Sequence, residues 1–411
     1  MSDLYRRLKA AKARGEAPRE ARPVREGPKE LGRDREHRAP EGFSLRDGVY
    51  LRRETIPLRE LGAEATLLGP GEPVHIPVRL SSGAAPEHAS ETPLLGTHIF
   101  FDLEATGLST GAGNVAFLLG LGFLSRSGFE LIQWLLPDYP YEPELLSAVA
   151  SELQLLQERL GPLTLVSYNG RSFDTPLLRT RMLMNGIPFE PPKELDLLPI
   201  SRRFWRGELE NCSLGTVEEG VLSIQRELDV PGAFVPLRYF DYLRSGRPEP
   251  LLEVVAHHRQ DILSLYLLLS RIETILRGVA GSSGLGPDLF ELGKLLIEQE
   301  PLPGARARGE ALLRELTAQG TAERAALYYG RHLRREGELE KAYEVWNRAF
   351  RGCGSVAAGI MAAKLLEHQF REYEEALSLV EELLAQQDKP PRLEASLLHR
   401  QERLRRRSAS S

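Results

Sequence analysis

The spacing of apolar residues predicts alternating strands and helices between residues 96 and 275. Short apolar and aromatic runs predict strands at 98–104, 115–123, 129–136 and 163–167. Apolar positions at helical spacing predict helices at 142–160, 175–185 and 250–276. The order strand, strand, strand, helix, strand, helix is typical of an α/β domain with a mixed sheet flanked by helices.

The regions outside 96–275 differ in composition. Residues 1–45 are basic, rich in Arg, Glu and Pro and poor in apolar residues, so we expect a disordered tail. Residues 46–95 hold short alternating runs broken by Gly and Pro, which predict a small β-rich lead-in. A Gly/Ser-rich stretch at 276–286 predicts a linker, and the basic residues 388–411 predict a frayed C-terminal tail.

Residues 287–387 are predicted to form an all-helical domain. Within it, Leu339-Glu-Lys-Ala342 aligns with Tyr373-Glu-Glu-Ala376 at an offset of 34 residues. That offset is the tetratricopeptide period, in which each unit is a helical hairpin and the units stack. Ordinary helical hairpins are an equal alternative. Stacked repeats of this kind would offer a surface for a protein partner.

The composition favours a cytoplasmic protein with more than one domain. The 411 residues are 42% hydrophobic, with no apolar run of about 18 residues that would span a membrane and no apolar segment typical of a secretory signal. Cys212 and Cys353 are far apart, which excludes a disulfide scaffold or a Cys-x-x-Cys metal site. The net charge of −5 does not indicate a protein that coats polyanions.

Two acidic residues stand in the first predicted strand. Because side chains alternate along a strand, the carboxylates of Asp102 and Glu104 share one face, while Ile99, Phe101 and Leu103 face a core. Adjacent carboxylates repel each other and lose hydration, a cost that a bound cation offsets. Oxygen ligands favour Mg²⁺ or Mn²⁺ over zinc. An exposed strand end without an ion is the alternative.

Two further positions carry candidate chemistry. Asp174 lies at the start of a predicted helix, where the backbone N–H groups favour an anion, and Asn169 ends the preceding strand. His257 and Asp261 are four residues apart and therefore share a helical face. The alternatives are a helix cap at Asp174 and a structural hydrogen bond between His257 and Asp261.

Three motifs in this order resemble those of the DEDD exonuclease superfamily, which has an RNase H-like fold. They are Phe101-Asp-Leu-Glu-Ala-Thr-Gly-Leu108, the Tyr-Asn-x-x-x-Phe-Asp-x-Pro stretch at 168–176, and the His-x-x-x-Asp stretch at 257–261. The chain is most similar to the YprB-like branch, in which tetratricopeptide repeats follow the RNase H-like domain. The resemblance implies a 3′–5′ exonuclease that hydrolyses phosphodiester bonds with two Mg²⁺ or Mn²⁺ ions. The implied metal ligands are Asp102, Glu104, Asp174 and Asp261.

The resemblance also implies a general base and a path for nucleic acid. His257 is assigned as the base, although it stands where the superfamily places a tyrosine, and His258 is the fallback. The implied partner is a single-stranded 3′ end of DNA or RNA. The candidate residues for binding it are Thr106, Gly107, Leu108, Asn169, Arg171 and Phe173. For Phe173, a place in the core is the favoured alternative.

Other interpretations were weighed against the exonuclease. A basic run with aromatic residues, Arg202–Arg206, could bind phosphates and bases or could be a solvated helix face. The nuclease-like domain could bind nucleic acid without cutting it, in an assembly protein. The Gly-x-Ser-x-Gly stretch at 107–111 matches a serine hydrolase, but a predicted strand follows where that motif needs a helix. Neither the choice of DNA or RNA nor exo- against endonucleolytic cutting follows from the residues.

Overall fold

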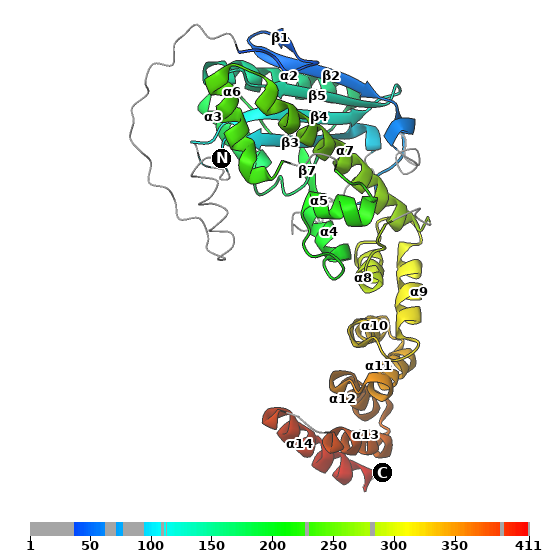
Figure 1. Ribbon diagram of the computed structural model, residues 1–411. Helices are drawn as coiled ribbons and strands as arrows, with labels where there is room; N and C mark the ends of the chain where they lie inside the picture. Colours follow the sequence, from blue (N-terminus) through cyan, green and yellow to red (C-terminus); the bar gives the residue numbers. More distant parts are fainter. Residues whose placement is uncertain are drawn as a thin grey trace.

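The computed structural model describes residues 37–61, 71–76, 94–107, 111, 113–226, 230–279, 284–386 and 390–409. In these ranges a mixed sheet flanked by helices is followed along the chain by helices alone (Figure 1). Most of the tail predicted over 1–45 lies outside the described residues, but its last residues enter strand β1 (Ser44–Arg46). No helix in the described ranges has the length and apolarity needed to cross a membrane.

The sheet has seven strands in the order β1-β2-β5-β4-β3-β6-β7. Besides β1, they are β2 (Val49–Ile56), β3 (His98–Ala105), β4 (Ala116–Leu124), β5 (Phe129–Leu135), β6 (Thr164–Ser167) and β7 (Lys193–Asp196). β3 is central, because β4 pairs with it antiparallel and β6 pairs with it parallel. The four strands predicted between 96 and 275 are confirmed to within a residue or two at their ends.

Helices cover both faces of the sheet. The predicted helices are confirmed as α2 (Glu142–Leu160), α3 (Asp174–Met184) and α7 (Glu249–Arg277). Short elements that were not predicted lie between α3 and α7: α4 (Leu198–Trp205), α5 (Leu214–Val217), the π-helical turn η6 (Glu218–Leu222) and α6 (Val235–Ser245). Single 3₁₀ turns lie at Leu58–Leu61, Leu95–Thr97, Tyr139–Tyr141 and Gly232–Phe234.

The C-terminal region consists of helices that each pack on the next and extend away from the sheet (Figure 1). They are α8 (Leu289–Gln299), α9 (Ala305–Thr317), α10 (Glu323–Arg335), α11 (Leu339–Cys353), α12 (Val356–Leu365) with the π-helical turn η8 (Leu366–Phe370), α13 (Tyr373–Ala385) and α14 (Pro391–Ser408). The prediction of an all-helical region is confirmed. Ala342 and Ala376, the matched small residues of the predicted repeat, are both fully buried.

The end of the chain corrects one expectation. The residues expected to fray after 388 form α14 instead, with Leu397 and Leu404 buried. The basic side chains on this helix are not simply solvated, because Arg400 and Arg403 both pair with the buried carboxylate of Glu367 in η8. Breaking these pairs would leave a buried charge without a partner, so they hold the last helix in place.

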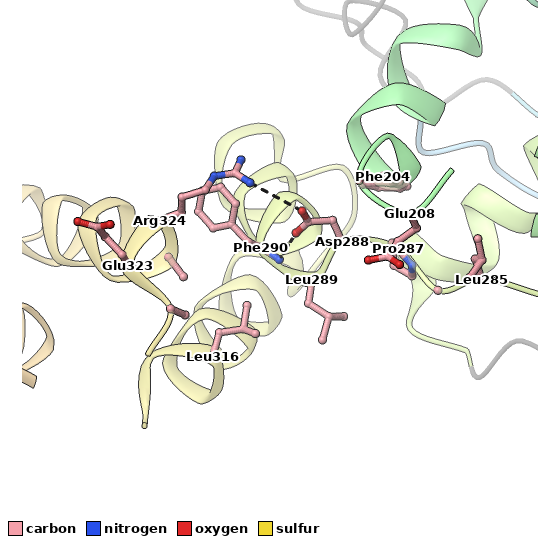
Figure 2. A pocket seen from close by; sticks show the side chains of 14 residues that line it. Phe204, Glu208, Leu285, Pro287, Asp288, Leu289, Phe290, Leu316, Glu323 and Arg324 are labelled. Carbon is pink, nitrogen blue, oxygen red and sulfur yellow. Dashed lines mark hydrogen bonds and ion pairs between the residues drawn. The ribbon is translucent and has the colours of Figure 1, made fainter. Parts of the chain in front are cut away.

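A cavity of about 660 Å³ lies between α4, the segment leading into α8 and the start of α10 (Figure 2). On its wall the Arg324 guanidinium lies 4.7 Å from the centre of the Phe290 ring. The basic run Arg202–Arg206 lies nearby, with Arg202 and Arg206 exposed, but its aromatic residues cannot stack on bases. Phe204 and Trp205 are fully buried, and Arg203 Nε is 3.1 Å from Glu291 of α8.

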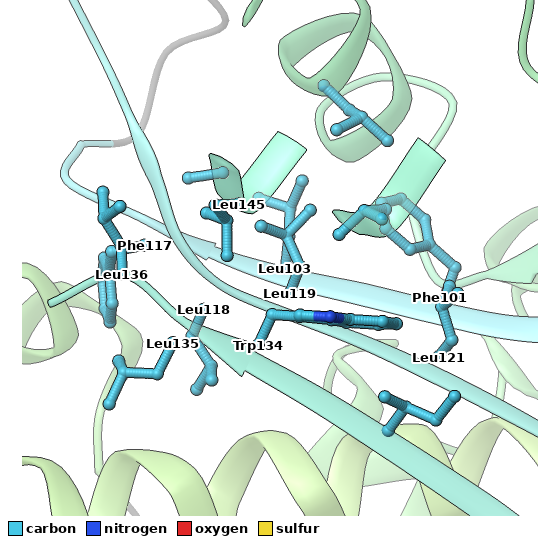
Figure 3. Close-up of a cluster of buried hydrophobic side chains, with 14 of the residues drawn as sticks. Phe101, Leu103, Phe117, Leu118, Leu119, Leu121, Trp134, Leu135, Leu136 and Leu145 are labelled. Carbon is cyan, nitrogen blue, oxygen red and sulfur yellow. The ribbon is translucent and has the colours of Figure 1, made fainter. Parts of the chain in front are cut away.

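Two hydrophobic clusters hold the domain together, one on each face of the sheet. The first contains Ile99, Phe101 and Leu103 of β3, as the alternation predicted, packed against α2, α3 and α6. Figure 3 shows Phe101, Leu103 and Trp134 among its side chains. The second contains Phe100 of β3, packed against the C-terminal half of α7. Residues 98–101 of β3 are therefore buried between the two clusters, and Asp102 and Glu104 follow them in the same strand.

Close approach of α7 to the sheet depends on a glycine. In the register of the strands, Gly120 of β4 stands between Asp102 of β3 and Gln133 of β5. A Cβ atom at Gly120 would lie 2.2 Å from Ile262 Cδ1 and 2.4 Å from His258 Cε1. Only glycine lets α7 lie this close, and the contact brings the histidines of α7 against the acidic end of β3.

Candidate active site

Acidic side chains of β3 and α7 meet at this contact. Asp102 and Glu104 are half-buried on the face of β3 that looks toward α7, as the alternation predicted. From α7, His257 Nε2 lies 3.2 Å from Asp261 Oδ2. One ligand atom each from Glu104, His257 and Asp261 lie within 4.8 Å of one another, a spacing that suits a bound metal ion.

Asp174 approaches the same place from α3. It is the first residue of that helix, directly after the β6 strand and its loop, and it is buried. No side-chain cap of the helix is formed at the position before it. The negative charges of Glu104 and Asp174 raise the pKa of Asp102, and that of Glu104 also raises the pKa of Asp174. The four predicted carboxylates therefore act on one another electrostatically.

The positive charges near the cluster do not offset all of its carboxylates in the metal-free chain. Burial, followed by the neighbouring carboxylates, raises the pKa of Asp102 and of Asp174 well above the usual range, and raises the pKa of Glu104 to about 8. Asp261 differs: burial opposes ionisation, but His257 and Arg226 outweigh it and lower its pKa. A divalent cation placed among these oxygens would offset the repulsion.

The raised pKa of Glu104 predicts how the stability of the metal-free chain depends on pH. The folded state holds a proton that the unfolded chain gives up from pH 4.5 upward, so stability is greatest below that pH and falls as the pH rises toward 8. We expect the midpoint of thermal unfolding, measured in chelator, to fall by several degrees between pH 5 and pH 8. In Glu104→Gln the midpoint should change less with pH. A midpoint of the parent chain that stays constant between pH 5 and pH 8 would contradict the prediction.

His257 and His258 are adjacent but differ in their surroundings. His258 is fully buried, its Nδ1 accepts a hydrogen bond from Gln133 Nε2 at 2.9 Å, and its Nε2 donates to the Asp102 carbonyl at 3.1 Å. Burial lowers its pKa to about 4, so it stays neutral. The fallback assignment of His258 as a base is not supported, because its ring has no exposed surface, whereas part of the His257 side chain is exposed. His257 faces the carboxylates, and although burial opposes this, Asp261 raises its pKa.

An arginine that the sequence analysis missed lies in this cluster. Arg226 donates to Glu218 and to Asp261, and its Nη1 lies 2.8 Å from His257 Nδ1. Glu218, in η6, is fully buried. Neither residue belongs to a periodic pattern that would place it at the site.

The residues predicted to bind nucleic acid lie in two loops. Thr106 is bonded to Val115 through its backbone N–H and its hydroxyl, and Gly107 lies so close to Asn114 that a Cβ atom would clash with that side chain. Leu108 lies outside the described residues. These contacts tie the end of β3 to the start of β4, beside the acidic cluster.

The second loop joins β6 to α3. Asn169 is exposed with a φ of +65°, and its backbone N–H donates to Asp196 Oδ1 at 2.8 Å. Asp196 thus helps to fix the loop, because it also accepts from the backbone N–H of Leu198. Arg171 is half-buried. Burial raises the pKa of Glu194, and the positive charge of Arg171 partly opposes this rise. Phe173 packs against the hydrophobic core, which supports the core interpretation over a stacking role.

Comparison with known proteins identifies the family. A model of the RNase H superfamily matches residues 99–273. The chain is 30% identical over 320 residues to the uncharacterized protein YprB of Bacillus subtilis (strain 168), with 76% of the chain and 75% of that protein covered. The chain belongs to the YprB family. The RNase H-like fold and the resemblance to the YprB-like branch are thereby confirmed, whereas the tetratricopeptide assignment stays a prediction.

Among solved structures, the fold resembles part of the family B DNA polymerase from the hyperthermophilic archaeon Pyrobaculum calidifontis. The match has a TM-score of 0.36 and 15% sequence identity, and covers 57% of the chain and 30% of the polymerase. The chain thus spans less than a third of that structure.

The serine hydrolase alternative is wrong for this YprB-family chain: strand β4 follows the Gly-x-Ser-x-Gly stretch, where a hydrolase needs a helix.

Proposed function

We propose that the chain is a metal-dependent nuclease that removes nucleotides from the 3′ end of a single-stranded nucleic acid. The observation that carries the proposal is the convergence of Glu104, His257 and Asp261. Asp102 and Asp174 lie close by: besides burial, the charge of Asp174 raises the pKa of Asp102, and the charge of Glu104 raises the pKa of Asp174. An RNase H superfamily domain over residues 99–273 supports it, because many enzymes of this superfamily cut phosphodiester bonds.

The donor atoms fit hard divalent cations. The cluster offers carboxylate oxygens and one imidazole, and burial together with neighbouring carboxylates raises the pKa of Asp102 and of Glu104. Asp102, Glu104, Asp174 and Asp261 would hold two Mg²⁺ or Mn²⁺ ions. When bound, such ions polarise a water molecule and neutralise the charge that develops on phosphate oxygens.

Residues of the chain would supply the remaining steps. His257 accepts the proton of the attacking water as the water oxygen bonds to phosphorus and the bond to the leaving 3′ oxygen breaks. The leaving oxygen then takes up a proton from solvent. Thr106, Gly107 and Leu108 would lie against the terminal nucleotide, while Asn169 and Arg171 would contact the strand behind it. Phe173 is held back from this role by its packing.

One assay tests the activity. Matched DNA and RNA oligonucleotides, each labelled at the 3′ or the 5′ end, are incubated with the full chain and Mn²⁺. Stepwise shortening from the 3′ end supports the proposal, and the preferred sugar identifies the substrate. Internal cuts would make the chain an endonuclease. Binding without any metal-dependent cleavage would favour the alternative, a non-catalytic nucleic-acid-binding or assembly protein.

Metal binding is also predicted to stabilise the fold. Since a ligand that binds only the folded state raises the unfolding midpoint by mass action, Mn²⁺ at about 100 times its Kd should add about 2.7 kcal/mol. Thermal unfolding with increasing Mn²⁺ measures this shift, and the chain in chelator is the reference. A midpoint that does not move at millimolar Mn²⁺ would contradict a preformed metal site.

The helical region would serve a different purpose. We propose that the pairs α10–α11 and α12–α13 are tetratricopeptide units, which is supported by their 34-residue offset and by the buried Ala342 and Ala376. Such units present an extended surface to a protein partner. Removal of the region from α10 onward should leave the cleavage of short oligonucleotides unchanged if it acts only on a partner.

A further inference from the structure

A buried ion pair lies directly beside the proposed metal site. The Arg226 guanidinium donates through Nε and Nη2 to the two carboxylate oxygens of Glu218, which has no exposed surface. The same Nη2 donates to Asp261, and Nη1 lies 2.8 Å from His257 Nδ1. One guanidinium therefore joins a buried carboxylate to two residues of the proposed site.

The backbone is shaped to make this connection. After the π-helical turn η6, Ser223 adopts a φ of +56° and the N–H of Ile224 donates to the carbonyl of Glu218 at 3.0 Å. This turn reverses the chain, so Arg226 comes back over Glu218 although it lies eight residues further along. A left-handed conformation is unusual for serine. The local fold thus brings Arg226 to Glu218 and, through it, to Asp261.

The arrangement treats the four carboxylates unequally. Of the four carboxylates, Asp261 forms an ion pair with an arginine. Within the described residues, Asp102, Glu104 and Asp174 form no ion pair with lysine or arginine. A guanidinium stays charged at any physiological pH and cannot leave by losing its proton. Arg226 bonds the Oδ1 oxygen of Asp261, so a metal ion that is to use this oxygen must compete with Arg226 for it.

We propose that Arg226 is a positioning residue that serves as an internal cation, holding the Asp261 carboxylate in the metal-free chain and yielding it when a divalent ion binds. The proposal rests on the proposed function, where Asp261 is taken as a metal ligand. Glu218 makes the exchange possible, because the displaced guanidinium keeps a buried partner and no charge is left unpaired. The exchange also withdraws the donor that Arg226 presents to His257 Nδ1.

The test is a Mn²⁺ titration of the full chain by calorimetry, with no nucleic acid present. The decisive variant is Glu218→Gln with Arg226→Gln, which removes one negative and one positive charge and leaves two amides that can bond each other. We expect Mn²⁺ to bind this variant about tenfold more tightly than the parent chain, since no charge-assisted hydrogen bond has to be broken. Arg226→Gln alone should also bind more tightly.

Two controls separate the possible outcomes. The first control is Arg259→Gln. Arg259 lies on α7 and pairs with Glu54 rather than with the carboxylates of the site, so this variant should bind Mn²⁺ like the parent chain. Equal affinity in the parent chain and the double variant overturns the internal-cation role and leaves the proposed function standing. If Arg226→Gln alone binds Mn²⁺ more tightly than the parent chain but the double variant does not, the internal-cation role is also overturned. The higher affinity would then come from the freed Glu218 carboxylate. No Mn²⁺ binding in any of them overturns the metal site itself.

Discussion

Replacing Asp102 with asparagine is expected to abolish metal-dependent cleavage and, in the absence of metal, to make the chain more stable. The two effects have one cause. Burial and three neighbouring carboxylates raise the pKa of Asp102, so its charge is costly in the metal-free fold, and that same charge is what would hold the ions. The amide keeps the shape of the side chain, and the backbone carbonyl that accepts from His258 is untouched.

Loss of this ligand should lower the single-turnover cleavage rate at least about 1,000-fold, which corresponds to about 4 kcal/mol of transition-state stabilisation. At pH 8 in chelator, the unfolding midpoint of Asp102→Asn should be higher than that of the parent chain by several degrees. Asp241→Asn, a change on the exposed face of α6, should alter neither quantity. Cleavage that survives Asp102→Asn would refute the assignment of the site.

The periodic parts of the chain could be predicted from the sequence. β3 has four buried residues before Asp102 and then alternates, so the shared face of Asp102 and Glu104 follows from backbone geometry alone. α7 was predicted almost to the residue, because apolar positions recur at helical spacing on both sides of the polar residues 257–261 and end before Gly278, whose φ is +74°.

The elements without periodicity could not be predicted. β7 has the sequence Lys-Glu-Leu-Asp and is a strand because β6 offers it a parallel edge, which no local pattern records. Arg226 reaches the site through a π-helical turn and a left-handed serine, and both depend on the packing around Glu218. The basic end of the chain looked solvated because its partner, Glu367, lies more than thirty residues earlier.

Alanine substitutions of the two neighbouring histidines are expected to have different effects: His258→Ala should lower stability, and His257→Ala should slow cleavage. His258→Ala should lower the free energy of unfolding by about 2–4 kcal/mol, because it opens a cavity and removes the bonds of the His258 ring to Gln133 Nε2 and to the Asp102 carbonyl. Gln133 Nε2 then keeps only its bond to the Val255 carbonyl. His257→Ala should unfold close to the temperature of the parent chain but cleave about 100-fold or more slowly at saturating Mn²⁺, as is typical when a general base is lost.

The pH dependence of the rate distinguishes a base from a residue that only shapes the site. In the parent chain, cleavage should rise with pH through the pKa of His257, which Asp261 holds above 6.5, because the imidazole must be unprotonated to accept a proton. His257→Ala should lose this rise, while His258→Ala, assayed below its unfolding temperature, should keep it. If both variants kept the rise, the proton would go elsewhere. If both lost it, the position of His257 on α7 would depend on its buried neighbour, since adjacent helical residues share one backbone.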